Sequence, residues 1–156
     1  NNSDAEFVFS IPSSAGHWSN ANMLLIFDHK GAGSTADSSV VKLMVSENGG
    51  AVDHWFELTG NNRLANVTDG QWHHLAFAYD ETTSDMKIYR DGVLYSTQSW
   101  AGHGAIKMDQ SKASGFYLGG KTTDWGKSFN GSIDQFRLYN KALTAAEVQN
   151  LYVNKL

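Results

Sequence analysis

Cysteine is absent from the 156-residue chain. This excludes disulfide bonds, thiolate metal sites and a cysteine nucleophile. Charged residues make up only 18% of the chain, and no basic run accompanies the net charge of −4, which argues against nucleic acid as a partner. No apolar stretch approaches the roughly 18 residues that a membrane-spanning helix needs. Since a secreted animal domain of this size would more often carry a disulfide, we expect a bacterial protein that is secreted or exposed at the cell surface.

Proline is also scarce, with one residue, whereas glycine occurs 15 times. Glycine, serine and asparagine separate short apolar runs, a composition typical of strands joined by turns. Hydrophobic residues form 41% and aromatic residues 12% of the chain, enough for one domain with its own core over residues 1–156. The chain does not begin with Met, so we expect a trimmed or excised part of a larger multidomain protein.

The segment Asp69–Gly92 predicts three consecutive antiparallel strands. Its sequence is DGQWHHLAFAYDETTSDMKIYRDG. The aromatic-rich run Trp72–Tyr79 and the alternating run Met86–Arg90 predict the first two strands, with a polar turn between them. Asp91-Gly92 is the strongest short hairpin signal, because both turn residues need positive φ, and Val93–Tyr95 then begins the third strand.

Alternation along the first of these strands sorts its side chains onto two faces. One face carries three large side chains, expected in the core, beside a histidine, and the other carries two alanines beside a tryptophan and a histidine. The first set is His73, Leu75, Phe77 and Tyr79, and the second is Trp72, His74, Ala76 and Ala78. The small alanines predict either a tightly covered face or a shallow floor with room above it.

Short apolar runs elsewhere predict further strands, and only the end of the chain predicts a helix. The strands expected outside the central segment cover residues 7–11, 23–28, 40–46, 52–58, 116–118 and 129–139. Thr144 and Glu147 have the spacing of a capping box, in which each side chain bonds the backbone amide of the other residue. Leu143 and Val148 stand where a hydrophobic staple would lie. Many short strands and one terminal helix predict an all-β fold, an antiparallel two-sheet β-sandwich with a short C-terminal helix.

Two segments resemble the laminin G-like, concanavalin A-like lectin family. They are DGQWHHLAFAYDETTSDMKIYRDGVL, from Asp69, and FYLGGKTTDWGKSFNGSIDQFRLYNKALTAAEVQNLY, from Phe116. The resemblance implies a jelly roll of two antiparallel sheets. It also implies an accessory module of a secreted polysaccharide-degrading enzyme or of an adhesin, often with bound calcium. The first half departs from the family pattern, because the chain opens at what looks like the second strand and Ile11-Pro12 stands where a tryptophan is usual. We therefore expect a trimmed N-terminal strand.

The motifs of an enzyme are missing. A glycosidase needs two carboxylates about 5 to 10 Å apart. Glu57, Glu81 and Glu147 stand apart in the sequence, however, and the Glu-x-Asp-x-x-Glu motif of the related glucanases does not occur. Neither Gly-x-Ser-x-Gly nor His-Glu-x-x-His occurs. We therefore predict that the domain is not an enzyme.

Residue spacing gives little support to a metal site. His73 and His74 are adjacent in a predicted strand, so they point to opposite faces and cannot share one ion. We interpret them as a core histidine and a sheet-face histidine. Asp134, in Gly-Ser-Ile-Asp, is the position that the resemblance associates with calcium. Because calcium takes about six to eight oxygen ligands, one aspartate does not define its site, and calcium is expected from the resemblance alone.

Carbohydrate binding needs an aromatic ring for the C–H face of a sugar and polar side chains for its hydroxyl groups. Trp125 is the strongest candidate, because Asp124 and Lys127 place an acceptor and a donor beside it. Trp72 is interpreted as structural, from its place in the family signature. The further candidates are tryptophans in or near polar loops and the histidines close to them: Trp100 with His103, Trp55 with His54, and Trp18.

The sequence thus predicts non-catalytic binding of a polysaccharide or oligosaccharide. The alternative is a protein- or peptide-binding module of a bacterial adhesin, which would use the same loops with backbone hydrogen bonds in place of sugar stacking. Exposed aromatic rings spaced like sugar rings would favour the first function, and an open sheet edge or a peptide-wide groove the second. A spacer without a ligand is a third interpretation.

Overall fold

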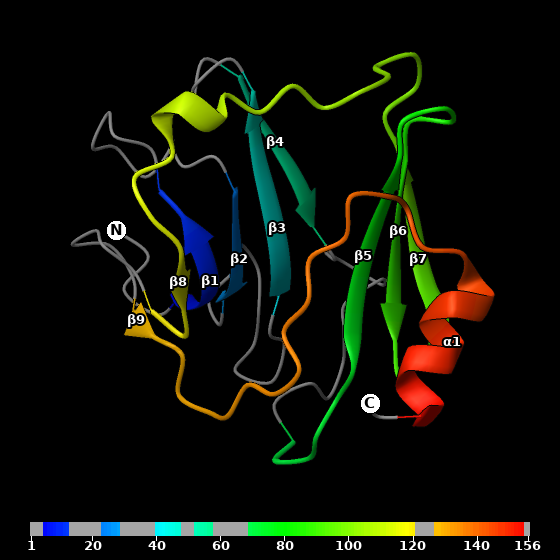
Figure 1. The fold of residues 1–156 in the computed structure, drawn as a ribbon. Coiled ribbons are helices and arrows are strands. Elements are labelled where there is room, and N and C mark those ends of the chain that lie inside the picture. Colours follow the sequence, from blue (N-terminus) through cyan, green and yellow to red (C-terminus); the bar gives the residue numbers. More distant parts are fainter. Residues whose placement is uncertain are drawn as a thin grey trace. The chain divides into compact units, whose positions relative to one another are not determined.

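The computed structural model describes residues 5–12, 23–28, 40–47, 52–57, 69–120 and 127–154 (Figure 1). The chain divides into two compact units, Asn1–Asn66 with Lys107–Ile133 and Val67–Ile106 with Asp134–Leu156. Each unit has its own sheet. No helix within the described ranges is long and apolar enough to cross a membrane. The prediction of a single domain over residues 1–156 stays a prediction.

The first unit holds a sheet of six strands, in the order β4-β3-β2-β1-β8, with β9 also paired to β1. The pairing is antiparallel except between β1 and β9, which run parallel. A short 3-10 helix, Gln110–Lys112, precedes β8. The strands are β1 (Ala5–Ile11), β2 (Met23–Asp28), β3 (Val40–Glu47), β4 (Val52–Glu57), β8 (Tyr117–Leu118) and β9 (Lys127–Ser128).

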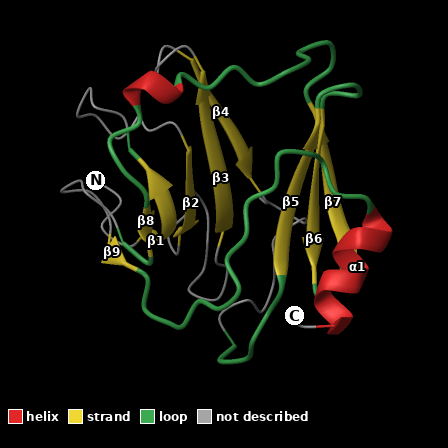
Figure 2. Cartoon of the chain, in the orientation of Figure 1, coloured by secondary structure: helices red, strands yellow, loops and turns green. Residues whose placement is uncertain are grey.

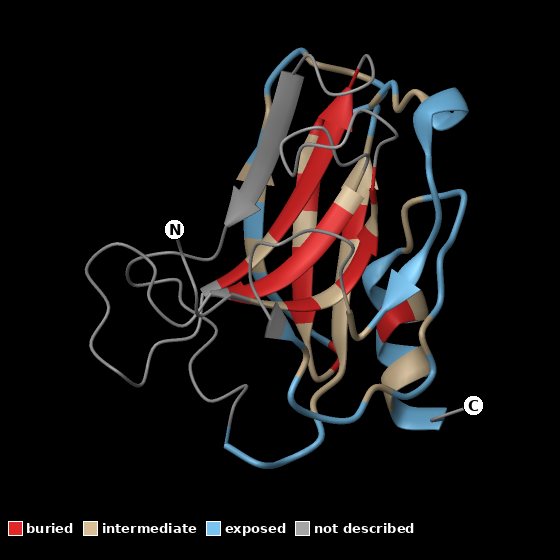
Figure 3. Ribbon diagram, turned by 90° about the vertical axis from the view of Figure 1, so that its left-hand side faces the viewer, coloured by how far each residue is buried: buried red, intermediate tan, exposed pale blue. Residues whose placement is uncertain are grey.

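The core of this unit lies on its central strands, where buried residues are concentrated (Figure 3). Phe7, Leu24, Ile26 and Met44 form one buried cluster. Along β2 all four residues from Leu24 to Phe27 are buried. A continuous apolar run is what a strand covered on both faces requires, so the buried strand predicted over residues 23–28 is confirmed.

The second unit holds the three antiparallel strands predicted from Asp69–Gly92. They are β5 (Leu75–Asp80), β6 (Asp85–Arg90) and β7 (Val93–Ser99), in the order β5-β6-β7. Asp91 and Gly92 have φ of 51° and 79°. Both values are positive, as the tight hairpin turn requires, so the turn is confirmed.

Helix α1 (Ala145–Asn154) begins with the predicted capping box. The Thr144 amide donates to Glu147 Oε2 at 2.8 Å, and the Glu147 amide donates to Thr144 Oγ1 at 3.3 Å. Val148 is fully buried and packs with Ala78 and Tyr89, and Leu143 lies against the same cluster. The alanine face of β5 is therefore tightly covered, and α1 is the element that covers it.

Gly92 lies close under α1. A Cβ atom at this position would lie 2.7 Å from Gln149 Oε1 and 2.9 Å from Tyr152 Cδ1. Contacts below 3.0 Å are not tolerated without a shift of one partner. Glycine is thus required here for two reasons, the positive φ of the turn and the approach of the helix.

The predicted strand over residues 129–139 is wrong. Only β9 forms near its start, and Figure 2 shows the described chain from Phe129 to Thr144 as loop. Gln135 has a φ of 52°, which is incompatible with an extended strand, and its amide donates to Asp134 Oδ1 at 2.8 Å. The local aspartate bond competes with strand pairing, which an apolar alternation pattern does not reveal.

Candidate functional site

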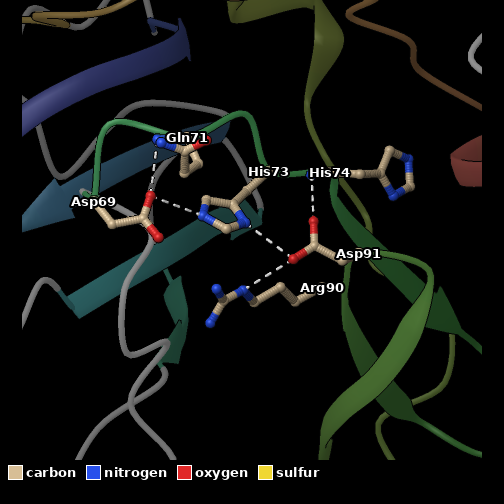
Figure 4. Close-up of polar contacts among 6 residues, drawn as sticks. All are labelled: Asp69, Gln71, His73, His74, Arg90 and Asp91. Atoms are coloured by element: carbon tan, nitrogen blue, oxygen red, sulfur yellow. Dashed lines mark hydrogen bonds and ion pairs between the residues drawn. The ribbon is translucent and has the colours of Figure 1, made fainter.

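His73 lies between two carboxylates just before β5 (Figure 4). Its Nδ1 is 2.9 Å from Asp91 Oδ2, and its Nε2 is 3.1 Å from Asp69 Oδ1. Arg90 Nε donates to the same Asp91 Oδ2 at 3.2 Å, and the His74 amide donates to Asp91 Oδ1 at 3.0 Å. Both carboxylate contacts of His73 are hydrogen bonds at the same time only when the ring carries two N–H groups.

The two carboxylates of this cluster remain ionised in mildly acidic solution. A hydrogen bond from the Gln71 amide is the main cause that lowers the pKa of Asp69, with His73 adding to it. Burial pushes the pKa of Asp91 upward, but hydrogen bonds from His73 and the His74 amide outweigh burial and lower it. Asp69 and Asp91 therefore each carry a negative charge beside His73 and Arg90.

His74 points away from this cluster, as Figure 4 shows. Its ring lies 6.1 Å from the Tyr152 ring, centroid to centroid, and its buried Nδ1 has no hydrogen-bond partner. Burial lowers the pKa of His74, and Arg137 lowers it further against the opposing effect of Asp91. The prediction that the two adjacent histidines point in opposite directions is confirmed.

Trp72 directly follows a tight turn beside the cluster. Asp69 Oδ1 accepts from the Gln71 amide at 2.8 Å and Gly70 has a φ of 81°, so residues 69–71 form an Asx turn. The side chain of Trp72 is 70% exposed. The structure thus differs from our interpretation of Trp72 as structural, since most of this residue is exposed to solvent.

The sequence did not reveal this cluster. The Asp69-to-His73 spacing of four residues was a local signal that could have been used. Asp91 is 18 residues from His73, however. It approaches the ring only because β5 and β6 pair with Leu75 opposite Arg90. Our expectation of His73 in the core neglected its carboxylate partners.

Trp100 and His103 form the one predicted site pair whose side chains the described ranges include together. Their rings stack with centroids 3.4 Å apart. The loop is fixed by Ser84, whose carbonyl accepts from the Trp100 amide at 2.7 Å and whose Oγ accepts from the Gly104 amide at 2.9 Å. Tyr79 donates its hydroxyl to the Gly104 carbonyl at 2.7 Å. The loop that carries the pair is therefore held by hydrogen bonds from its backbone to Ser84 and Tyr79.

The remaining predicted site residues are not tested by the structure. Trp125, Asp124 and Trp18 lie outside the described residues. His54 and Trp55 lie on β4, opposite Val45 and Met44, and Lys127 lies on β9 opposite Glu6, where the backbone alone is described. Their roles in ligand binding stay predictions.

Asp134 does not define a calcium site within the described part of the chain. It is exposed, and its Oδ1 accepts from the next amide along the chain. No group of three or more His, Asp or Glu side chains that could hold a metal occurs among the described residues. A single carboxylate does not fit calcium, so calcium at Asp134 stays a prediction whose further ligands would come from other residues.

The two aromatic positions lie at opposite ends of the second sheet. Trp72 precedes the start of β5, whereas Trp100 follows Ser99, which pairs with Asp85 at the other end of β6. β5 has six residues, so about 20 Å of strand separates them at about 3.3 Å per residue. They cannot contact the same sugar ring.

Comparison with known proteins decides the family. The model of the concanavalin A-like lectin/glucanases superfamily matches residues 7–149. The chain belongs to this superfamily. The match includes the first segment in which we noted the resemblance and the second up to residue 149, so the laminin G-like, concanavalin A-like prediction is confirmed.

Solved structures share the superfamily fold at low sequence identity. A Bacteroides ovatus protein provisionally described as carbohydrate-binding has a TM-score of 0.63 and 22% identity, over 94% of this chain and 36% of that chain. The CBM40 of the Ruminococcus gnavus IT-sialidase has a TM-score of 0.62 and 16% identity, over 97% of this chain and 76% of that chain. The predicted jelly-roll sandwich with one short C-terminal helix is therefore confirmed as the fold class.

A curated relative is found in the rat, Rattus norvegicus. It is the sushi, von Willebrand factor type A, EGF and pentraxin domain-containing protein 1, 29% identical over 107 residues. The alignment spans 60% of this chain and 3% of that relative. This lectin-superfamily chain thus matches a small part of the relative's length.

Proposed function

We propose that the chain is a non-catalytic carbohydrate-binding module. The observation that carries this proposal is the exposed Trp72 indole, in a turn that also presents the exposed side chains of Asp69 and Gln71. An indole supplies a flat surface for the C–H face of a pyranose, and the carboxylate and amide supply partners for its hydroxyl groups. Large exposed aromatic side chains commonly mark interaction sites.

The same cluster favours binding over catalysis. Asp69 and Asp91 both contact the ring of His73. Both carboxylates therefore bind the same imidazole ring. A glycosidase instead needs two carboxylates that flank its substrate. Membership of a superfamily of lectins and glucanases, with the CBM40 as a structural neighbour, supports the proposal.

The cellular setting forms part of this proposal. The cysteine-free composition and the superfamily support a bacterial protein that is secreted or displayed at the cell surface. The chain spans 36% of the Bacteroides ovatus protein and 3% of the rat relative. This supports a place in a larger multidomain protein, such as a polysaccharide-degrading enzyme or an adhesin.

A glycan array with the purified protein tests the proposal, run with calcium and again with chelator. We expect binding to at least one glycan class, and we expect Trp72→Ala to abolish it with an unchanged circular dichroism spectrum. Trp100→Ala is the matched control, because that tryptophan lies at the other end of the same sheet. Trp125→Ala tests the strongest sequence candidate in parallel. If glycan binding is lost only with Trp100→Ala or only with Trp125→Ala, the binding site does not include Trp72.

One observation favours the peptide-binding alternative. Among the described strands β7 pairs with β6 alone. Its first two side chains, Val93 and Leu94, are 65% and 49% exposed. An edge strand of this kind can accept an extended peptide as a further strand. A blank array with a folded protein, together with peptide-dependent protection of the β7 amides from hydrogen exchange, would support this function instead.

A further inference from the structure

We propose that the turn 69–71 and the adjacent Trp72 select amino sugars, with the protonated amine of the ligand on Asp69 and the sugar ring on the indole of Trp72. This inference rests on the proposed function and names its ligand class. It follows from how the two carboxylates beside His73 are used, from the exposure of Trp72 and from the charge of the cluster.

Asp69 and Asp91 differ in the hydrogen-bonding capacity that they retain. Asp91 uses both oxygens, since Oδ1 accepts from the His74 amide and Oδ2 contacts His73 and Arg90. Asp69 uses Oδ1 alone, for the Gln71 amide and His73. Its side chain is 37% exposed. The Oδ2 atom of Asp69 is therefore the acceptor that the cluster offers to a ligand.

The indole of Trp72 strengthens the preference for a cation. Trp72 is 70% exposed and follows Asp69 by three residues, directly after the turn. The face of an indole attracts ammonium groups. A sugar that carries a free amine satisfies both partners, whereas an N-acetylated sugar presents a neutral amide to Asp69.

The positive groups of the cluster do not cancel this preference. Arg90 directs its Nε to Asp91 at 3.2 Å, so its charge is offset by that carboxylate. With His73 neutral, the two aspartates and Arg90 leave one negative charge, and with His73 protonated the four groups are neutral. In neither state does the cluster repel a cation, and the net charge of the chain is −4.

Isothermal titration calorimetry with two ligands tests the inference. A glucosamine oligosaccharide and the N-acetylglucosamine oligosaccharide of the same length differ only in acetylation. The buffer keeps the sugar amine protonated. We expect the glucosamine ligand to bind roughly tenfold more tightly, the size of one exposed ion pair with one cation–π contact.

Asp69→Asn removes the negative charge of Asp69 and keeps the turn, because the amide oxygen of asparagine can still accept from the Gln71 amide. This variant should lose the tenfold preference and keep its affinity for the N-acetylated ligand. Trp72→Ala should lose both ligands. Asp109→Asn is the matched control, since Asp109 also accepts from the amide two residues on, that of Ser111, and should keep the preference.

Equal affinity for the two ligands, or a preference that survives Asp69→Asn, would overturn the inference. Binding of neutral glycans without an amine preference would leave the proposed function standing and remove this inference alone. No binding of any glycan by the folded wild-type protein would remove both.

Discussion

Thr144 shows how much one hydroxyl contributes to a helix. Its Oγ1 accepts from the Glu147 amide at 3.3 Å, and its own amide donates to Glu147 Oε2 at 2.8 Å. We expect Thr144→Ala to lower the free energy of unfolding by about 1 kcal/mol, the usual effect of losing a cap. Urea unfolding followed by circular dichroism measures this. Thr83→Ala, in an exposed turn, is the control and should change stability by less than about 0.5 kcal/mol.

Features that depend on residues close together in the sequence were predictable, and those that depend on distant residues were not. The capping box and the Asp91-Gly92 turn were predictable, because each depends on residues at most three positions apart. The exposure of Trp72 was not, since the aromatic run was interpreted as strand from Trp72 onward, whereas β5 begins only at Leu75. Asp91 as a partner of His73 was missed because strand pairing brings the two together from 18 positions apart.

At the scale of elements, the β6–β7 turn lies close against α1 in the second unit. We expect Gly92→Ala to destabilise the protein strongly, because the new methyl group would clash with Gln149 and Tyr152 while φ stays at 79°. Gly102→Ala is a matched control, since Gly102 has the same φ of 79° and open space around its Cβ position.

Thermal denaturation of the two variants separates backbone strain from the clash. Gly102→Ala should lose about 1 to 2 kcal/mol, the strain of a left-handed alanine. Gly92→Ala should lose clearly more and should also reduce the helical circular dichroism signal of α1. Equal losses would show that the helix adapts without cost and would contradict the close approach.

Element boundaries also limited the sequence analysis. The three central strands were found because alternation and turn dipeptides agree over Asp69–Gly92, but the first begins at Leu75 and not at Trp72 as predicted. The strand expected at residues 129–139 failed at Gln135, where a positive φ of 52° and the neighbouring Asp134 side chain direct the chain out of an extended path. For the candidate site at Trp125 nothing is decided, since that residue lies outside the described ranges.

At the scale of the whole molecule, the shifted groups in the described part of the chain predict stability that falls in acid. The pKa of Asp69, Asp91 and Asp109 is lowered, and Lys141 is the main cause that lowers the pKa of Glu147 to about 2. Carboxyls with a lowered folded pKa stabilise above their unfolded pKa of about 4 and lose this contribution as pH falls through the folded value.

His74 also lowers the stability of the protein in acid, beginning at a higher pH than the carboxyl groups do. Burial lowers its pKa from 6.5. The unfolded chain therefore takes up a proton near this pH while the folded protein does not, and stability declines as pH falls below it. Urea midpoints across the acid range should show two declines, one below about pH 6.5 and one below about pH 4.5. A His74→Leu variant should lose the first decline and keep the second.

The close approach at Gly92 also has a consequence for how the sequence can drift. A side chain at position 92 would occupy the space that the side chains of positions 149 and 152 now fill, although more than 50 residues of chain separate the first from the other two. A related chain with a larger residue after the aspartate of this turn should carry smaller side chains at the two helix positions, or a helix that begins later. Substitutions at these three places should therefore be accepted in sets, and a laboratory search for variants of the turn will succeed only if all three positions vary together.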